Sequence, residues 1–441
     1  MKQGIVKSRS PRPAGRSRPA GVVALALVAS AAVLATATPV HATGAAGIAQ
    51  PYEARSGGSM WFPGGRPDAA YRLLDLLATS QVDGVDPRQF RLRGLQRAVR
   101  GSAGSPATDR LLSEALVNYV AAVRAVPASN EWTIVDRDVV RTPARVSTLL
   151  RQAAAAGSLA TFVETMPWMH ETYSGLRREL LLAEQRRDRA AAATLRLNLN
   201  RARLLPGAGP ERYVMVNIAA QRLYMYENGK VVDWMRVVVG KPAQPTPQMA
   251  ALIRYTAVNP YWNLPSDLVA ERIAPNVVKL GMPYLREKGY VVLSDWSENA
   301  KRVDPTTVDW KAVVAGRTDI RMRQNPGPAN AMGRMKFMFP NKAGVYLHDT
   351  PNKELLDEPA RLLSAGCVRL DDAPRLAKWL YGRPLVVTKG MKPEQQVALD
   401  RPVPVYLAYL TAVSSGNQAV YYDDIYGFDR TRLAQLRVAS R

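Results

Sequence analysis

The hydrophobic pattern of this chain changes its period at Tyr213. Before that residue, apolar side chains recur at helical spacing, as they do over residues 111–123, whereas residues 214–218 alternate in the manner of a strand. A chain of 441 residues is comfortably long enough for two domains. The sequence therefore predicts an α+β multidomain protein, with a helical domain at 60–205 and a mostly β domain at 211–392.

The predicted helical domain shows no set of residues arranged for catalysis. We predict one long helix over residues 176–204 at its end. We interpret Asp83, Asp86 and Asp109 as turn or helix-cap residues, because a short carboxylate side chain can accept hydrogen bonds from free backbone N–H groups.

The β domain contains one strong turn signal and one large interruption. Asn228-Gly229 lies between two β-rich runs, which predicts a hairpin. Residues 261–324 are partly helical in pattern, and we interpret them as a lid-like insertion or, alternatively, as a packed structural excursion. Residues 393–441 are predicted to be a C-terminal extension. The remaining predictions are short strands at 336–339, 345–347, 368–370 and 385–388, and a helix at 373–381.

The N-terminus has the pattern of a secretory signal. Six basic residues precede an uncharged apolar run at 21–38, and Val40-His41-Ala42 fits a small-x-small cleavage site. We predict a signal peptide at 1–42, a periplasmic location, and a flexible lead-in at 43–59 that is rich in Gly, Ala and Ser. An uncleaved membrane anchor is the alternative, since the apolar run is about long enough to span a bilayer.

The chain is strongly basic, with a formal net charge of +23 at pH 7. Six of these charges lie in the predicted signal, so the exported part stays basic and invites an anionic partner. Nucleic acid is a poor candidate outside the cytoplasm, whereas cell-wall polymer and the anionic membrane face are better ones. The alternative is that the arginines are solvated residues on helix faces.

Cys367 is the single cysteine of the chain. Exported proteins use cysteines in pairs as disulfides, and this cysteine has no partner within the chain. It is either a small buried hydrophobe or a reactive thiol. Since His170 and His348 are the histidines beyond the predicted signal, the chain offers a poor zinc-binding set, and no metal or organic cofactor is expected.

His348 is the histidine that fits a cysteine acyl-transfer site. It ends one predicted strand, and Cys367 begins another nineteen residues later, so neighbouring strand ends would bring imidazole and thiol together. An adjacent imidazole makes the reactive thiolate available near neutral pH as an ion pair. His170, in the helical domain, is interpreted as a packing or surface residue.

The residues around Cys367 suit an oxyanion hole. Gly366 lets the backbone approach a reacting carbonyl without a Cβ clash, and Ser364 keeps the approach open. Arg369 would lie on the same strand face as Cys367, where it would either hold a carboxylate or support a loop by hydrogen bonds.

These residues resemble the motif of the L,D-transpeptidases (YkuD-type), in which a histidine is followed by Ser/Thr-x-Gly-Cys-x-Arg. The resemblance covers about residues 211–392, and the tail at 404–429 and the N-terminal helical scaffold domain are typical of the larger Gram-negative members. Two features depart from the family. Ala365 occupies a position where many members have a second histidine, and we see no peptidoglycan-binding module between residues 130 and 210.

The resemblance implies a peptidoglycan L,D-transpeptidase that acts on peptide stems and is acylated by carbapenems. Cys367 would attack the third-residue carbonyl of a donor tetrapeptide, with His348 as general base. The backbone N–H groups of Cys367 and Gly366 would stabilise the oxyanion, supported by Ser364, and the main-chain carbonyl of Asp349 would orient the imidazole. The substrate-binding residues expected from the sequence are Tyr346, Arg369 and Trp262.

The acceptor of the acyl group stays open. A second stem would give a 3→3 cross-link, water would give an L,D-carboxypeptidase or endopeptidase, a lysine amine would attach a protein, and a D-amino acid would be exchanged. A wall-binding scaffold with an inactive site is the non-enzymatic alternative. The helical domain would bind other cell-wall synthesis proteins or brace the lid.

Overall fold

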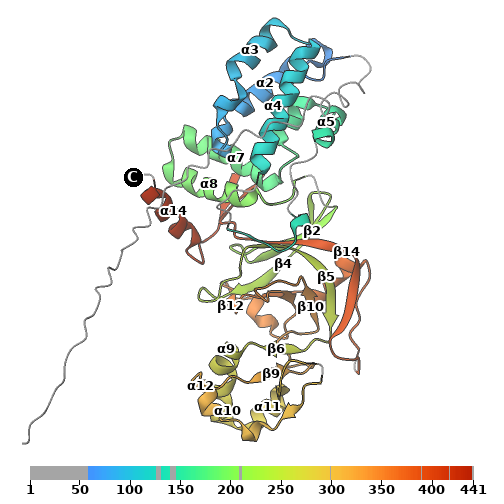
Figure 1. Cartoon of the computed structure of the whole chain (residues 1–441), viewed down its shortest axis with the longest axis vertical. Coiled ribbons are helices and arrows are strands. Elements are labelled where there is room, and N and C mark those ends of the chain that lie inside the picture. Colours follow the sequence, from blue (N-terminus) through green and yellow to red (C-terminus); the bar gives the residue numbers. More distant parts are fainter. Residues whose placement is uncertain are drawn as a thin grey trace, which may run out of the picture. The chain divides into compact units, whose positions relative to one another are not determined.

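The computed structural model describes residues 58–125, 131–139, 146–207, 211–297, 299–388, 390–416 and 418–439 (Figure 1). The predicted signal at 1–42 and most of the predicted lead-in lie outside these residues. Within the described ranges, no helix combines the length and the apolar character needed to cross a bilayer.

The helical domain is built from short amphipathic helices, several of which begin at a side-chain N-cap. Ser105, Ser158 and Asp188 each accept a hydrogen bond from a backbone N–H in the first turn of the helix that follows. The helices are α2 (Asp68–Ala78), α3 (Leu92–Gly101), α4 (Pro106–Arg124), α5 (Val146–Ala155), α6 (Leu159–Thr165), α7 (Glu171–Gln185) and α8 (Arg189–Ala202), with 3-10 turns at Pro63–Gly65, Ser80–Asp83, Pro87–Phe90 and Arg137–Val139.

The single helix predicted over 176–204 is wrong, because the chain turns between α7 and α8. Arg187 adopts a left-handed conformation (φ 57°), and Asp188 then caps α8. Neither residue is a glycine or proline, so the hydrophobic period alone gave no sign of the break.

Asp83 ends the 3-10 turn Ser80–Asp83, as predicted, but its side chain also forms a buried ion pair that the sequence did not reveal. Its carboxylate is fully buried and accepts hydrogen bonds from Arg177 Nε (2.9 Å), Tyr119 Oη (2.9 Å) and Tyr173 Oη (2.8 Å). Asp86 caps the 3-10 turn that follows it, as predicted. Asp109 is buried and accepts from Met60 N–H at 2.6 Å, which fixes the start of the described chain.

Most strands after residue 211 form one large sheet, in which the first and last parts of the strand order also pair with each other. Along the described chain the order is β1-β5-β10-β11-β13-β4-β3-β2-β14, with β12 beside β4, and β14 also pairs with β5. The strands are β1 (Thr133–Ile134), β2 (Arg212–Asn217), β3 (Arg222–Glu227), β4 (Lys230–Gly240), β5 (Met249–Val258), β10 (Met335–Met338), β11 (Leu347–His348), β12 (Leu362–Ser364), β13 (Val368–Leu370) and β14 (Gln395–Ala408).

Several local predictions for this sheet can be checked. The hairpin at Asn228-Gly229 joins β3 to β4, and the helix α13 spans Ala373–Tyr381, both as predicted. The strand expected at 385–388 does not form, and the one expected at 345–347 is shifted to β11. β14 lies beyond residue 392 and is nevertheless an integral strand, because it pairs with β2 and β5.

The insertion after β5 forms a lobe with its own small sheet and core. Four strands run in the order β6-β9-β7-β8, and Leu264, Val269, Trp310 and Met322 are buried among the helices. The elements are β6 (Trp262–Leu264), α9 (Ser266–Leu268), a π-helical turn (Val269–Ile273), α10 (Ala274–Leu280), α11 (Met282–Lys288), β7 (Tyr290–Leu293), β8 (Arg302–Val303), a 3-10 turn (Pro305–Thr307), α12 (Trp310–Val314) and β9 (Arg321–Gln324).

The helical domain and the sheet share one hydrophobic core. Leu116 and Tyr173 belong to the same buried cluster as Tyr213 and Tyr406 of the sheet. A second core, which includes Leu347 and Val368, lies beneath the strands that carry the candidate site. The remaining elements are a 3-10 turn (Lys353–Leu356), β15 (Ala412–Ser415), β16 (Gln418–Tyr421) and α14 (Phe428–Ala439).

Candidate active site

Parallel pairing of β11 with β13 brings the predicted nucleophile and base segments together. Leu347 lies opposite Val368, and His348 lies opposite Arg369, so Cys367 comes one residue before the paired part of β13. The half-buried Cys367 has its Sγ 3.8 Å from the Gly344 carbonyl oxygen. The two segments are paired in the sheet although Cys367 follows His348 by nineteen residues in the sequence.

His348 is held in one tautomer. Its Nδ1 lies 2.6 Å from the main-chain oxygen of Asp349, and the side chain is 1% exposed. A carbonyl oxygen only accepts hydrogen bonds, so Nδ1 carries the proton and Nε2 keeps its lone pair. The ring therefore has the tautomer that a general base needs.

The side chain of Asp349 is engaged elsewhere. Its carboxylate accepts from Lys353 Nζ (2.8 Å) and from the backbone N–H of Arg334 (2.9 Å). A Cβ at Gly333 would collide with this carboxylate, and Gly333 also has φ 59°. The side chain thus fixes the loop, while the main-chain carbonyl orients the imidazole.

Burial keeps the imidazole neutral. Burial lowers the pKa of His348 to about 3, the positive charge of Arg369 acts in the same direction, and the hydrogen bond to Asp349 opposes it. Burial raises the pKa of Cys367, against hydrogen bonds from Tyr346 and the charge of Arg369. The resting pair is therefore a thiol and a neutral imidazole, in contrast to the ion pair expected from the sequence.

The backbone around Cys367 is clamped on both sides. Ser364 Oγ donates to the Cys367 carbonyl (2.5 Å) and accepts from Gly366 N–H (3.1 Å). Gly366 has φ 107°, a conformation that side-chain-bearing residues rarely adopt, so glycine is required there. Ser364 thus supports the turn through hydrogen bonds as well as through its small size.

Tyr346 and Arg369 both lie beside the candidate pair of Cys367 and His348. The Tyr346 ring centroid is 5.6 Å from that of His348, and its side chain hydrogen-bonds to Cys367. Arg369 is partly buried, and burial together with the charge of Arg272 lowers its pKa. Arg272 belongs to the insertion, so this lobe contributes positive charge to the site.

Trp262 is placed differently from the other predicted substrate-binding residues. It lies on β6, where it pairs with Gln324 and packs partly buried against the core of the insertion. Trp262 thus packs against the lobe itself. Its contact with substrate stays a prediction.

Two residues of the stretch that resembles the family, Lys336 and Thr246, were given no role in the site by sequence reasoning. Lys336 lies opposite His348 on β10, is 8% exposed, and donates to Glu394 (2.7 Å). Thr246 is fully buried and donates to the Gly366 carbonyl (2.8 Å). The available signal was weak, since a lone lysine in a strand and a Thr-Pro loop are common features of surfaces.

Other features of the described chain lie apart from this site. A cavity of about 950 Å³ is lined by residues that include His170 and Tyr213. His170 is buried, caps α7 and contacts Tyr213 Oη at 3.1 Å, so it is a packing residue as expected. No group of His, Cys, Asp or Glu side chains within the described ranges is arranged to hold a metal ion.

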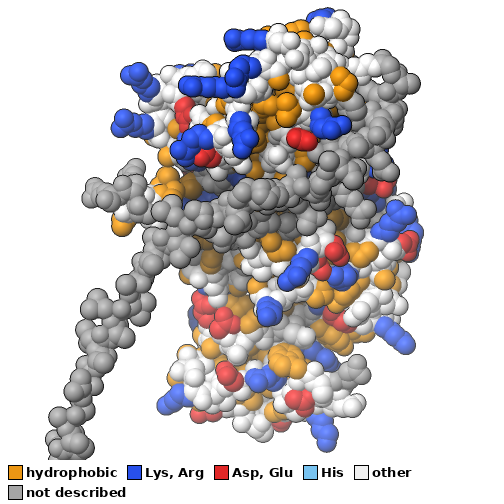
Figure 2. All heavy atoms as spheres, turned by 45° about the horizontal axis from the view of Figure 1, so that its top comes forward, with side chains coloured by type: hydrophobic (Ala, Val, Ile, Leu, Met, Phe, Trp, Pro, Cys, Tyr) orange, Lys and Arg blue, Asp and Glu red, His pale blue; other side chains and the backbone are white. Residues whose placement is uncertain are grey.

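Positive charge is distributed over the visible surface. Figure 2 shows Lys and Arg side chains spread over this face, with Asp and Glu side chains among them. This arrangement fits the alternative in which many of the arginines are solvated side chains.

Comparison with known proteins assigns both halves of the chain. Residues 211–405 match the YkuD family model, described as the L,D-transpeptidase catalytic domain, and residues 46–180 match the Scaffold domain. A Haemophilus influenzae protein assigned as an L,D-transpeptidase is 33% identical over 243 residues, which are 54% of this chain and 48% of that protein. The chain thus spans about half the length of this curated relative.

Solved structures give a weaker likeness. An L,D-transpeptidase from Mycobacterium smegmatis is 18% identical, with a TM-score of 0.22, over 45% of this chain and 59% of the other. The assignment therefore rests on the family models and the Haemophilus relative, and with them the predicted α+β architecture is confirmed. Residues 211–405 of this chain therefore match an L,D-transpeptidase catalytic domain of the YkuD family, and residues 46–180 match a Scaffold domain.

Proposed function

We propose that this protein is an exported peptidoglycan L,D-transpeptidase that forms 3→3 cross-links through a thioester on Cys367. One observation carries the proposal. The Nδ1–H of His348 is directed at the Asp349 carbonyl, which leaves Nε2 as a free base in the strand beside Cys367, within a YkuD domain.

The first half-reaction forms the acyl-enzyme. As Cys367 Sγ attacks the third-residue carbonyl of a donor tetrapeptide stem, its proton passes to His348 Nε2. The backbone N–H of Cys367 lies between the Gly366 N–H and the Cys367 carbonyl, which Ser364 holds, and it would face the developing oxyanion. Collapse of the tetrahedral intermediate breaks the amide bond, and His348 returns the proton to the leaving D-alanine amine.

The second half-reaction resolves the thioester. The side-chain amine of the third residue of a second stem attacks the thioester carbonyl and gives its proton to His348. The new amide is the 3→3 cross-link, and the thiolate recovers the proton from His348. The complete reaction consumes two stems, releases one D-alanine and returns Cys367 to its thiol form.

The charge of the site supports an anionic donor. Arg369 is partly buried two residues after Cys367, and Arg272 adds positive charge from the insertion. Stem peptides carry free carboxylates at their ends, and a guanidinium binds a carboxylate through paired hydrogen bonds. We therefore assign Arg369 to the donor carboxylate.

The predicted signal supports a periplasmic location, where peptidoglycan stems are found. Two alternative reactions use the same Cys367 thioester. If water resolves it, the protein is an L,D-carboxypeptidase or endopeptidase. If a protein lysine resolves it, that protein becomes attached to the wall. The part of the chain that matches the Scaffold domain would bind other cell-wall synthesis proteins or brace the insertion. Acylation by carbapenems is expected because a β-lactam carbonyl presents the same electrophile to Cys367.

Intact-protein mass spectrometry tests the proposal. Residues 43–441 are incubated with a diaminopimelate tetrapeptide stem beside a Cys367→Ala control. An adduct equal to the stem minus alanine, absent from the control, is the expected result, and a second stem then shows whether an amine or water resolves it. A protein that is alkylated normally at Cys367 but gives no adduct would contradict the proposed donor.

A further inference from the structure

The peptide bond between Gly366 and Cys367 is held from one side by Thr246. Thr246 Oγ1 donates to the Gly366 carbonyl at 2.8 Å, and the threonine is fully buried. In a planar trans peptide, the carbonyl and the following N–H point in opposite directions. Fixing the Gly366 oxygen on Thr246 therefore aims the Cys367 N–H away from Thr246.

Thr246 is itself fixed by a tight loop. Its Oγ1 accepts from Gly240 N–H at 2.9 Å, and a Cβ at Gly240 would collide with the backbone of Gln244 and Thr246. Tyr426 Oη closes this loop, since it donates to the Gly240 carbonyl (2.7 Å) and accepts from Thr246 N–H (3.3 Å). The hydroxyl of Tyr426 thus joins both ends of the loop that carries Thr246.

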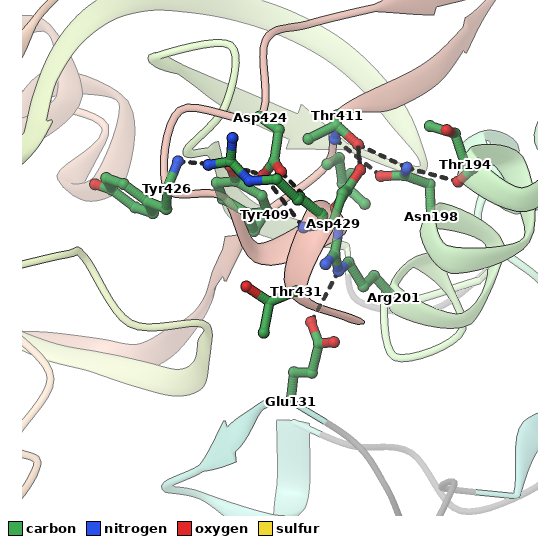
Figure 3. Close-up of polar contacts among 12 residues, drawn as sticks. Glu131, Thr194, Asn198, Arg201, Tyr409, Thr411, Asp424, Tyr426, Asp429 and Thr431 are labelled. Atoms are coloured by element: carbon green, nitrogen blue, oxygen red, sulfur yellow. Dashed lines mark hydrogen bonds and ion pairs between the residues drawn. The ribbon is translucent and has the colours of Figure 1, made fainter. Parts of the chain in front are cut away.

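Tyr426 rests on an aromatic platform. Its ring stacks on Tyr409 with centroids 5.5 Å apart, and its backbone N–H donates to Tyr409 Oη (3.0 Å). Tyr409 in turn donates to Asp424 Oδ1 at 2.7 Å, as Figure 3 shows. The segment after β14 is therefore hydrogen-bonded to the loop behind the candidate oxyanion hole.

The same segment is anchored to the helical domain. Arg201 of α8 pairs with Asp429 (2.5 Å) and with Glu131 (2.9 Å), and its guanidinium lies 5.2 Å from the centre of the Tyr409 ring (Figure 3). Asn198 of the same helix accepts from Thr411 N–H at 2.8 Å. These contacts tie the platform under Tyr426 to α8.

We propose that Thr246 is a positioning residue of the oxyanion hole, aiming the Cys367 N–H at the reacting carbonyl, and that Tyr426 holds Thr246 in place from the platform anchored on α8. The inference rests on the proposed acyl-transfer function of Cys367. It assigns to these two residues an effect on oxyanion stabilisation that is separate from thiol reactivity, because neither side chain is bonded to Sγ or to the imidazole.

A matched pair of variants tests the proposal. Thr246→Val keeps the shape of the side chain but removes its hydroxyl, whereas Thr246→Ser keeps the hydroxyl. For each, the rate constant of Cys367 acylation by the tetrapeptide stem is measured together with the rate of alkylation by iodoacetamide. Alkylation is a displacement without an oxyanion, so it reports the thiol alone.

The acylation-to-alkylation ratio is expected to fall about 10- to 100-fold in Thr246→Val, because a misaimed oxyanion donor loses most of its effect. It should stay within about 3-fold of the parent in Thr246→Ser, and Tyr426→Phe should lower it by about 3- to 10-fold. Tyr426→Phe also serves as the second variant if Thr246→Val does not fold. A ratio that stays unchanged in the folded variants would overturn the proposal, whether the acylation and alkylation rates both stay the same or both fall equally.

Acylation by p-nitrophenyl acetate separates this inference from the proposed function. This ester also passes through a tetrahedral oxyanion but needs no stem-binding site. If the parent protein reacts with the ester and not with the stem, the proposed donor is wrong, while the ratio measured with the ester still decides the role of Thr246.

Discussion

The imidazole of His348 is oriented by the main chain of Asp349 and not by its carboxylate, since Nδ1 lies 2.6 Å from the Asp349 carbonyl oxygen. The residue that orients the base can therefore change its side-chain charge without changing the tautomer. The carboxylate meanwhile bonds Lys353 and the backbone of Arg334.

We therefore expect Asp349→Asn to keep Cys367 acylation within about 10-fold of the parent, because the amide oxygen can still accept one of these bonds. Removal of the base in His348→Ala should lower the rate by about 10²- to 10⁴-fold. The acylation rates of both variants are measured with the tetrapeptide stem by quenching samples over time and analysing them by mass spectrometry. A loss in Asp349→Asn as large as in His348→Ala would show that the carboxylate takes part directly.

The thiol should titrate above neutral pH. Burial raises the pKa of Cys367, and His348, whose pKa is lowered to about 3, stays neutral and provides no counter-charge. The alkylation rate by iodoacetamide should therefore keep rising as the pH passes 8, because the thiolate fraction grows only near the raised pKa. A rate that reaches its plateau below pH 7 would show a preformed thiolate–imidazolium pair.

The buried Asp83–Arg177 pair should be a major support of the Scaffold domain. Asp83→Ala leaves Arg177, whose side chain is 9% exposed, without its carboxylate, and removes the acceptor of two tyrosine hydroxyls. We expect the free energy of unfolding to fall by about 3–5 kcal/mol. Urea denaturation followed by circular dichroism measures this, with Asp86→Ala, at an exposed 3-10 cap, as the control of smaller effect.

Stability should decline as the medium becomes acidic, in part through His170. Burial lowers its pKa to about 4, so the unfolded state binds a proton between about pH 6.5 and 4 that the folded state does not bind. Stability from this residue is complete above pH 6.5 and falls by about 2 kcal/mol at pH 5. His170→Asn keeps a helix cap without a titrating group, so urea denaturation at pH 7.5 and 5 should show a smaller difference for this variant. Equal pH dependence in both proteins would contradict the prediction.

Local patterns predicted the elements whose signals lie within a few residues. The Asn228-Gly229 hairpin, α13 and the change from helix to strand near Tyr213 depend on turn chemistry and hydrophobic period, and these are visible in the sequence. The turn at Arg187 was missed because it depends on a left-handed arginine, which no local preference favours.

Within the site, the motif identified the segments of Cys367 and His348, which the sheet places side by side. It did not reveal what Lys336, Thr246 or Tyr426 contact, because these contacts come from strand register and from residues far apart in the sequence. It also suggested an ion pair, where burial favours a neutral one. The burial of a site depends on the whole fold, so it cannot be predicted from a short motif.

The position of β14 has a consequence for how the protein is made. This strand lies between β2 and β5 and pairs with both, yet it follows every other strand of the large sheet in the sequence (Figure 1). As the chain emerges, either from the ribosome or across a membrane, β2 and β5 stay unpaired along these edges until residues 395–408 arrive. The segment at 364–370, which carries Cys367, is thus synthesised before the sheet that supports it can close.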